Sequence, residues 1–260
     1  VSCNDSVNLN NISQTRIFNI TLAQAAPTID TIAINSTDPT LNDTNQNITA
    51  HVTASDVNSD GIKLIYDWKL NGSSILLLNL PFEANESGNN TVDYSGSGSD
   101  GVITGSPVWS STSGYDGLGA YTLAGNNDYF DVGLQSELDG STSFSVSTWI
   151  KRSSTTSDQR IFGSWGTSNR KIVYWVDSDD KLYFGVSEDG AAPSYIASTG
   201  TITDTSYHHV SVTYDAGSVV HYLDGVQSGT GTTDSFVHTA ARNYFVGWDG
   251  YNTALIFDGI

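Results

Sequence analysis

The sequence predicts an all-β protein, and three observations support this prediction. Asp-Gly pairs, which favour tight turns because both residues tolerate a positive φ, occur eight times in the 260 residues. Short segments of alternating apolar and polar residues lie between these pairs. No window of helical length shows a convincing 3.6-residue period, and the 25 Gly, with abundant Ser, Thr and Asn, favour turns and strands over helices.

The clearest strands are expected in the second half of the chain. Segment 143–150 alternates between an apolar face and a serine face, Phe144, Val146 and Ile150 against Ser143, Ser145 and Ser147. Segment 208–214 alternates in the same way, with His208 on its apolar face and His209 on the other. Three further segments are largely apolar or aromatic on both faces and are predicted to be buried central strands: 171–176, 182–187 and 219–223.

The first 75 residues are predicted to form two smaller parts, a strand segment over 1–24 and a small sandwich over 25–75. Strands are expected at three segments, 28–34, 47–54 and 62–70. The last of them contains Tyr66 and Trp68 and is followed by an Asn71-Gly72 turn, which is typical of a small immunoglobulin-like sandwich over 25–75. Residues 1–24 are expected to be an isolated strand segment. Such a segment is either the end of a preceding repeat or a donor strand that completes the sheet edge of a neighbour.

The charge balance excludes some classes of partner. The chain has 10 Lys+Arg against 28 Asp+Glu, a formal net charge of −18. Nucleic acid is an unfavourable partner because a net-negative surface has few cations with which to replace counterions. Anionic membrane surfaces are unfavourable for the same reason. The longest apolar stretch, 75–78, is far too short to cross a bilayer, so we expect no membrane insertion within this segment.

Nine Asn-x-Ser/Thr sequons lie in the first 90 residues, and the remaining 170 residues contain none. They predict an exported glycoprotein with a glycosylated N-terminal part; the alternative is compositional bias in a region rich in Asn, Ser and Thr. The acceptor residues are Asn4, Asn11, Asn19, Asn35, Asn42, Asn47, Asn71, Asn85 and Asn89. The sequence has no Met, so we expect Val1 to follow a longer N-terminal portion. The single cysteine, Cys3, cannot form an internal disulfide.

Residues 76–260 resemble the laminin-G-like, concanavalin A-like jelly rolls. Six blocks carry the resemblance in the expected order: LLLNLPFE (76–83), DYSGSGSDG (93–101), GYDGLGAYTLAGNNDYFDVG (114–133), FSVSTWIKRS (144–153), HHVSVTYDAGSVVHYLDGV (208–226) and NYFVGWDGYNTALIFDGI (243–260). The leading zone is similar to the immunoglobulin-like repeats that flank such domains in large archaeal or bacterial surface proteins. In the family the final FDG is usually followed by a strand that closes the sheet, and here the sequence ends at Ile260.

The resemblance implies a possible calcium site at the rim of the sandwich. Calcium prefers several oxygen ligands, which Asp-rich loops supply. The family pattern points to Asp93 and Asp100, with Asp258 nearby. Ser99 stands where the family often has Asn, which weakens this assignment. The alternative is that these acids only form turns and keep the protein soluble. We expect no other cofactor.

No catalytic pattern is present, and we expect a protein that is not an enzyme. Hydrolases of this broad fold place carboxylates on one strand in an E-x-D-x-E-type pattern, which this sequence lacks. The acidic residues at 177–180 and 188–189 flank predicted turns. His208 and His209 point to opposite faces of a strand, which favours a structural role over a shared metal ligand.

Aromatic residues predict a possible carbohydrate-binding surface. Pyranose rings stack on aromatic rings, and five residues at strand ends or in loops beside polar residues are candidates: Trp165, Trp175, Tyr195, Trp248 and Tyr251. The competing interpretation is core or sheet packing, which is the usual role of aromatic residues in a sandwich.

Together these features predict an extracellular, cell-surface glycoprotein that acts in adhesion or recognition of glycans or partner proteins. The alternative is a structural subunit of a filament, sheath or S-layer-like coat, assembled from copies of itself by strand exchange. A third possibility is an accessory domain of a glycan-active enzyme. The fold class does not by itself choose between them.

Overall fold

The computed structural model describes residues 25–40, 46–83 and 90–260, and it divides the chain into two compact units, Val1–Leu64 and Ile65–Ile260. Each unit is described by itself. The expected strand segment 1–24, Cys3 and six of the nine sequon asparagines lie outside the described residues. The sequence-based boundary at 75/76 falls inside the second compact unit.

The described part of the first unit is an antiparallel ribbon of β1 (Thr28–Ser36) and β2 (Ile48–Ser55). The predicted strands 28–34 and 47–54 are therefore confirmed. Large apolar residues of this ribbon are exposed, Ile29, Ile32, Ile34 and Ile48 among them. A two-stranded ribbon is only marginally stable in water without a packing partner. An immunoglobulin-like sandwich over 25–75 stays a prediction.

The predicted strand 62–70 is wrong in extent. Only β3 (Lys69–Leu70) forms there, and it pairs with β4 (Ser73–Ser74). The predicted Asn71-Gly72 turn joins them, and both of its residues have a positive φ.

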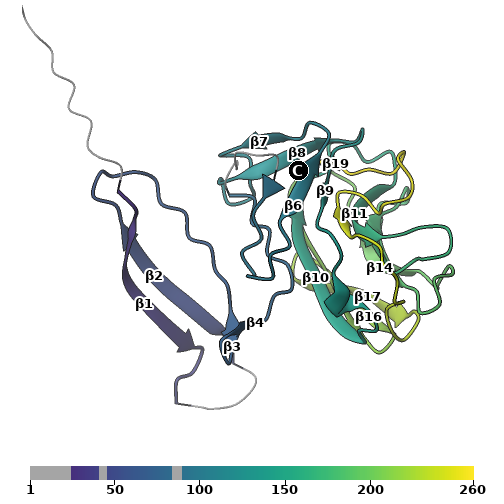
Figure 1. Cartoon of the computed structure of the whole chain (residues 1–260), viewed down its shortest axis with the longest axis horizontal. Helices are drawn as coiled ribbons and strands as arrows, with labels where there is room; N and C mark the ends of the chain where they lie inside the picture. Colours follow the sequence, from purple (N-terminus) through teal and green to yellow (C-terminus); the bar gives the residue numbers. More distant parts are fainter. Residues whose placement is uncertain (1–24, 41–45, 84–89) are drawn as a thin grey trace, which may run out of the picture. The chain divides into compact units, whose positions relative to one another are not determined.

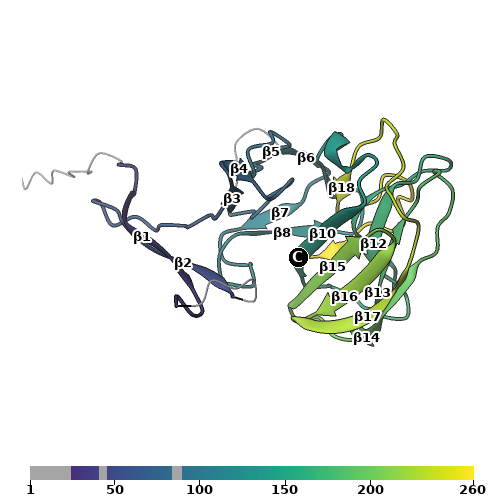
Figure 2. The same cartoon turned by 90° about the horizontal axis from the view of Figure 1, so that it is seen from below.

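The second unit consists mainly of two large antiparallel sheets (Figures 1 and 2). The larger sheet has the strand order β14-β13-β12-β11-β18-β9-β6-β5. Its strands are β5 (Asn90–Thr91), β6 (Gly101–Thr104), β9 (Tyr129–Asp131), β11 (Gln159–Ser164), β12 (Ile172–Val176), β13 (Lys181–Val186), β14 (Ile196–Thr201) and β18 (Phe245–Val246). The second sheet has the order β10-β15-β16-β17, and Figure 2 shows these strands side by side. They are β10 (Ser143–Ile150), β15 (His208–Asp215), β16 (Ser218–Leu223) and β17 (Val226–Thr232).

The hydrophobic core lies between these two sheets. Val210, Val212 and Tyr214 of β15 belong to the same buried cluster as Tyr174 and Phe184 of the larger sheet. The ring of Phe184 lies 6.2 Å from that of Tyr214, centroid to centroid. Two facing sheets with alternating inward side chains form a β-sandwich, so the predicted all-β jelly roll is confirmed. The predicted strands 143–150, 171–176, 182–187, 208–214 and 219–223 all form, and every residue of β12 is buried.

A smaller sheet, β19-β8-β7, lies beside the edge strand β10. It contains β7 (Val108–Ser110), β8 (Ala120–Ala124) and β19 (Asp258–Gly259). β19 pairs with β8, while Ile260 and Lys151 exchange two backbone hydrogen bonds of 2.6 and 2.8 Å. The end of the chain thus connects β8 to the residues that follow β10 (Figure 1).

Helical structure is almost absent from the described residues. The 3-10 turn η1 (Ser136–Leu138) is the single helical element in that part of the chain. No helix among the described residues is long and apolar enough to span a bilayer. The Asp-Gly turns form as expected; Asp224 and Gly225, for example, both adopt a positive φ between β16 and β17.

Candidate functional site

Three of the predicted glycan-binding residues lie together on the face of the larger sheet that points away from the core. Trp175 lies in β12, Trp165 directly follows β11 and Tyr195 directly precedes β14. The Tyr195 ring centroid lies 5.2 Å from that of Trp175 and 6.1 Å from that of Trp165. Tyr183 of β13 stacks on Trp175 at 5.1 Å. We call Trp165, Trp175, Tyr183 and Tyr195 the outer cluster.

Two arginines cover the tryptophans of the outer cluster. The Arg160 guanidinium carbon lies 4.8 Å from the Trp175 ring centroid, and that of Arg170 lies 5.6 Å from the Trp165 centroid. Both tryptophans are only 6% exposed. Their rings are therefore engaged in packing and cation–π contacts, and their predicted role as sugar platforms stays a prediction. Tyr195 is the exposed aromatic ring of this group, with 42% of its surface accessible.

The other two predicted residues lie elsewhere on the same unit. Trp248 packs against Tyr129 and Phe245, with centroid distances of 4.6 and 4.9 Å, and donates from its indole N–H to the Asn252 carbonyl oxygen. Tyr251 is exposed, and its backbone N–H donates to the Asp249 carboxylate. The same carboxylate accepts a hydrogen bond of 2.9 Å from Nε of Arg160. Asp249 thus links the Tyr251 loop to the outer cluster.

A second aromatic group, which the sequence-based search missed, is exposed on the outward face of the β10–β15 sheet. Tyr115 and Trp149 stack with their planes 9° apart and their centroids 3.4 Å apart. Tyr207 meets Tyr115 edge to face, and the His209 ring lies 5.2 Å from Trp149. Tyr115 is 57% exposed and Trp149 41% exposed. We call Tyr115, Trp149, Tyr207 and His209 the aromatic platform.

Backbone and side-chain hydrogen bonds hold the platform in place. The turn that carries Tyr115 is closed by a hydrogen bond from the Gly114 N–H to the Leu118 carbonyl oxygen. The Tyr207 hydroxyl donates to the carbonyl oxygen of Ser113, so it fixes the start of that turn. On the sheet, Ser147 and His209 share a 2.9 Å hydrogen bond between neighbouring strands. The rings are therefore positioned before a ligand arrives, which lowers the entropic cost of binding.

The sequence contains a signal for Trp149. In segment 143–150 the serine face consists of every second residue, and Trp149 is the next member of that series. It therefore has to point outward with Ser143, Ser145 and Ser147. A large aromatic residue on an otherwise polar strand face is the observation that identifies the platform. Tyr115, in a loop, carries no comparable signal.

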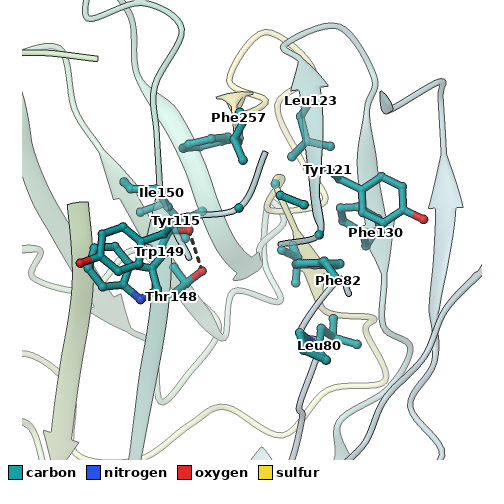
Figure 3. Close-up of a pocket in the computed structure, with 18 of the residues that line it drawn as sticks. Leu80, Phe82, Tyr115, Tyr121, Leu123, Phe130, Thr148, Trp149, Ile150 and Phe257 are labelled. Carbon is teal, nitrogen blue, oxygen red and sulfur yellow. Dashed lines mark hydrogen bonds between the residues drawn. The ribbon is translucent and has the colours of Figure 1, made fainter. Parts of the chain in front are cut away.

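A pocket of about 370 Å³ lies behind the platform, between β8 and β10. Figure 3 shows Tyr115, Trp149 and Ile150 on one side and Tyr121, Leu123 and Phe130 on the other. The remaining walls come from Leu80 and Phe82 and, near the end of the chain, from Phe257 and Ile260. The lining is mainly apolar, and the side chains of Asp116, Ser147 and Thr148 bring polar atoms to it.

The predicted calcium residues do not gather into one site. The Asp93 carboxylate accepts hydrogen bonds from the backbone N–H groups of Asn79 and Ser95 and from the hydroxyls of Ser95 and Ser97. Burial alone would raise the pKa of Asp93, but these hydrogen bonds outweigh it and hold the pKa below its usual value. Donors rather than vacant coordination positions surround this carboxylate, so Asp93 does not fit a calcium ligand well.

The other two calcium candidates are also engaged in the fold. Asp100 accepts the backbone N–H of Asp93, and Asp258 pairs with Ala124 in the β19–β8 ladder. In residues 25–40, 46–83 and 90–260, no group of three or more His, Cys, Asp or Glu side chains is arranged to hold a metal ion. Calcium binding therefore stays a prediction that Asp93, Asp100 and Asp258 support poorly.

One pair of carboxylates is close enough to share a hydrogen bond. Burial raises the pKa of Asp158, and the negative charge of Asp177 raises it further. Asp177 also accepts the indole N–H of Trp175, and both carboxylates accept the backbone N–H of Ser178. These contacts hold the turn that follows β12, as expected for the acidic residues of 177–180. His208 and His209 also have separate partners: His208 contacts Asp204 and Asp224, and His209 contacts Ser147.

Three sequon asparagines lie within the described residues. Asn35, Asn47 and Asn71 are all exposed, so each is accessible to modification. The others lie outside the described residues, namely Asn4, Asn11, Asn19, Asn42, Asn85 and Asn89. Glycosylation stays a prediction.

Comparison with solved structures found similar chains, three of which are described here. A structure of a mutant of HCR/D is 16% identical, with a TM-score of 0.52, and the match covers 66% of this chain and 44% of that one. Domain 4 of AbnA, a GH43 extracellular arabinanase from Geobacillus stearothermophilus in complex with arabinotriose, is 23% identical, with a TM-score of 0.48 and coverages of 64% and 81%. The carbohydrate-binding module CBM66 from Bacillus subtilis is 17% identical, with a TM-score of 0.36 and coverages of 56% and 86%. At these identities the likeness concerns the fold alone.

Sequence comparison assigns the family. No curated protein matches the chain. The family model described as the concanavalin A-like lectin/glucanases superfamily (Laminin_G_3) matches residues 124–260, from the end of β8 through β19. This range contains both large sheets except β5 and β6, and it includes Trp149, Tyr207 and His209. Because the match covers more than half of the chain, the protein belongs to the Laminin_G_3 family of concanavalin A-like lectins and glucanases.

Proposed function

We propose that the protein is a non-catalytic carbohydrate-binding module of an extracellular, cell-surface glycoprotein, where it acts in adhesion or recognition. The observation that carries this proposal is the exposed stack of Tyr115 on Trp149 at the mouth of the pocket. Monomeric proteins usually keep large aromatic rings inside, so two stacked and exposed rings mark a recognition surface. Membership of a family of lectins and glucanases supports a sugar as the ligand.

The platform has both kinds of group that a sugar requires. The exposed part of the Tyr115 ring offers an apolar surface to the C–H face of a pyranose or furanose ring. Asp116 lies beside it in the sequence, and Ser147 and His209 present hydroxyl and imidazole groups on the sheet. Such polar groups fix the orientation of a ligand, while the rings supply most of the contact area.

The contacts and positions of the paired carboxylates favour a binding role over a catalytic one. The Asp158–Asp177 pair is occupied by turn contacts and by the Trp175 indole, and it lies on the outer side of the larger sheet rather than at the pocket. The sequence has no E-x-D-x-E-type pattern. The export that a surface role requires is supported by the nine sequons, three of which lie on exposed residues.

Replacing the stacked tryptophan tests the proposal. Trp149→Ala is expected to weaken binding to a responsive polysaccharide by about tenfold or more, as for a central aromatic contact. The panel contains arabinan, xylan, β-glucan and mannan oligosaccharides, and the readout is isothermal titration calorimetry. Tyr251→Ala, which removes an equally exposed ring elsewhere, is the matched control and should leave the affinity unchanged. Lack of binding to every glycan, or loss only in Tyr251→Ala, would contradict the platform.

A second candidate function is assembly with copies of itself by strand exchange. The observation that favours it is the open edge of β10 beside the apolar pocket. Lys151 and Ile260 are paired, and alternate residues of a strand direct their backbone groups to the same side, so Ser147 and Trp149 also direct theirs toward this edge. An extended segment from another copy would add a strand there, beside the mouth of the pocket.

The oligomeric state distinguishes the second candidate from the first. Light scattering after size exclusion should show association that increases with concentration, and hydrogen exchange should show slower exchange of the Ser147 and Trp149 amides in the assembled form. Deletion of residues 1–24 should abolish assembly if that segment is the donor. A monomer at every concentration, with rapid exchange at both amides, would rule out strand exchange and leave the carbohydrate-binding proposal intact.

A further inference from the structure

Three of the ten Lys and Arg residues lie at the outer cluster. Arg160 and Arg170 lie over the two tryptophans, and Arg242 packs against Gly166, the residue after Trp165. A methyl group added at Gly166 would clash with Oδ1 of Asn169 and would lie 3.2 Å from Nη1 of Arg242, so the glycine leaves room for both side chains. In a chain with a net charge of −18, this concentration of arginine requires an explanation.

Ion pairing inside the fold explains only one of the three arginines. Arg160 donates from Nε to Asp249 at 2.9 Å, and the side chains are 13% and 2% exposed. The second carboxylate oxygen of Asp249 already accepts the backbone N–H groups of Tyr251 and Asn252. Within the described residues, neither Arg170 nor Arg242 forms an ion pair with an acidic side chain.

Several guanidinium N–H groups at this place also lack acceptors. Nη1 of Arg160, Nε of Arg170 and Nε of Arg242 are shielded from solvent, and none has a hydrogen-bond partner in the described part of the chain. Shielded donors without partners are unfavourable, and native proteins usually satisfy them with water or a ligand. Arg170 and Arg242 are half-buried, and Nη2 of Arg242 donates to the Gly250 carbonyl oxygen, which leaves Nη1 of Arg242 and the Nη atoms of Arg170 as the candidates to bind a ligand.

Tyr195 adds an exposed aromatic ring beside these cations. Burial raises the pKa of Tyr195; the positive charges of Arg170 and Arg160 act in the opposite direction, and the negative charge of Asp249 adds to the increase. The ring is 42% exposed and lies against Trp165 and Trp175. The outer cluster therefore presents an exposed aromatic ring next to two arginines, Arg170 and Arg242, that form no ion pair within the described residues.

We infer that the outer cluster binds an acidic saccharide, with the carboxylate of a uronic acid unit on Arg170 and Arg242 and its sugar ring on Tyr195. Guanidinium groups bind carboxylates through two parallel N–H···O hydrogen bonds, which are stronger than neutral ones and selective in geometry. This site is separate from the aromatic platform. The inference depends on the proposed function only for the class of ligand, a carbohydrate.

Two ligands that differ only in charge test the inference. Trigalacturonic acid is titrated against the full chain, with its fully methyl-esterified form as the neutral counterpart. The acid is expected to bind at least tenfold more tightly than the ester, and more weakly as salt is added, because a charge-assisted contact is screened. Binding should shift the indole N–H signals of Trp165 and Trp175 in a ¹⁵N-resolved NMR spectrum.

Variants then assign the site. Arg170→Gln should reduce the affinity for trigalacturonic acid by about tenfold, while Arg170→Lys should retain part of it. Lys181→Gln is the matched control, since it removes an exposed cation of the same sheet that is paired with Asp179. Unchanged melting temperatures would show that the variants are folded. Equal affinity for the acid and the ester, or full affinity in Arg170→Gln, would overturn the acidic-saccharide site.

The two proposals fail separately. Trp149→Ala leaves the outer cluster intact, so it should not change the binding of trigalacturonic acid. If the acid binds through Arg170 and no neutral glycan binds through Trp149, the inference stands and the platform is refuted. If neutral glycans bind through Trp149 and the acid shifts neither Trp165 nor Trp175, the platform stands and the inference is overturned.

Discussion

The outer cluster and the aromatic platform contain the same kinds of residue but use them differently. Trp175 of the outer cluster lies under Arg160 and beside Tyr183, and 6% of its surface is exposed. Trp149 of the platform stacks on one loop tyrosine and is 41% exposed. At the outer cluster the rings are packed, and of the three neighbouring arginines only Arg160 forms an ion pair within the described residues. In the platform the rings themselves are accessible.

The difference shows that neighbouring polar residues in the sequence do not make an aromatic residue accessible. Both tryptophans lie in strands and point away from the core, because each occupies an outward position of its sheet. The two tryptophans differ in how far other residues pack over them. Arg160 and the segment that carries Tyr195 pack over β12, whereas the stacked Tyr115 and Trp149 remain 57% and 41% exposed. Long-range packing, which local sequence does not specify, decides which group can bind a ligand through its rings.

The largest expected effect is on stability. Trp175→Ala should lower the free energy of unfolding by about 3–5 kcal/mol, the usual cost of deleting a buried tryptophan. Trp149→Ala should lower it by only about 1 kcal/mol, because its ring is 41% exposed and its ring contacts are with Tyr115 and His209. Urea denaturation at pH 7, followed by circular dichroism, measures both values. Similar losses in the two variants would show that the clusters do not differ in burial.

Two ion pairs on the larger sheet, Arg160–Asp249 and Lys181–Asp179, should differ in the same way in their contribution to stability, but by less. Asp249→Asn leaves Arg160 without its partner in a place where both side chains are nearly inaccessible, so we expect a loss of about 2–3 kcal/mol. Asp179→Asn removes the partner of Lys181, and both of those side chains are well exposed, so the loss should not exceed about 1 kcal/mol. Thermal unfolding at low and high salt gives the comparison. A high-salt difference close to zero would mean that Asp249 is solvated.

A strand could be predicted wherever its own sequence of apolar and polar residues shows which of its faces are buried. The alternation in 143–150 and 208–214 reflects one buried and one exposed face, and these segments form β10 and β15. The apolar run 171–176 reflects burial on both sides and forms β12. Segment 62–70 was predicted as a strand from Tyr66 and Trp68, yet only Lys69 and Leu70 pair. A strand also needs a neighbour, and no local pattern supplies one.

The sites were less predictable than the strands because they combine distant segments. Tyr115 and Trp149 are 34 positions apart, and Arg160 meets Asp249 across 89 positions. The alternation on β10 does place Trp149 outward, so one of the two stacked rings of the platform could be predicted from the sequence. Asp93 was identified as an acid in a turn-rich loop, but its engagement by Asn79, Ser95 and Ser97 depends on side-chain geometry.

Two histidines on the core-facing side of the second sheet, His208 and His221, extend the comparison to pH. Burial lowers the pKa of His221, despite its hydrogen bond to the Ile196 carbonyl oxygen. An unfolded histidine titrates near 6.5, so below about pH 6.5 the unfolded state binds more protons and stability falls, by at most about 1.4 kcal/mol per pH unit. His221→Gln should remove this part of the pH dependence. Unfolding at pH 5.5 and 7.5 gives the difference between wild type and variant.

His208 should behave in the opposite way. Partial burial alone would lower its pKa, but hydrogen bonds to Asp224 and Asp204 raise it above the usual value. Its contribution to stability is therefore present below about pH 6.5 and is lost as the pH rises through the raised pKa. His208→Gln should remove stability at pH 5.5 more than at pH 7.5. The same sign of change in both histidine variants would contradict the assignment of these shifts.

The smallest effect is expected from calcium. The Asp93 carboxylate already accepts hydrogen bonds within the fold, just as the tryptophans of the outer cluster are already packed against other side chains. Its oxygens accept N–H and hydroxyl groups, and an ion would have to displace them. We therefore expect millimolar calcium to change the melting temperature by less than about 1 °C relative to chelated protein, since a ligand stabilises only in proportion to its occupancy. Asp93→Asn should lower stability by about 1–3 kcal/mol in either solution, because buried donors lose their acceptor. A calcium-dependent rise that Asp93→Asn abolishes would show instead that this loop exchanges its hydrogen bonds for the ion.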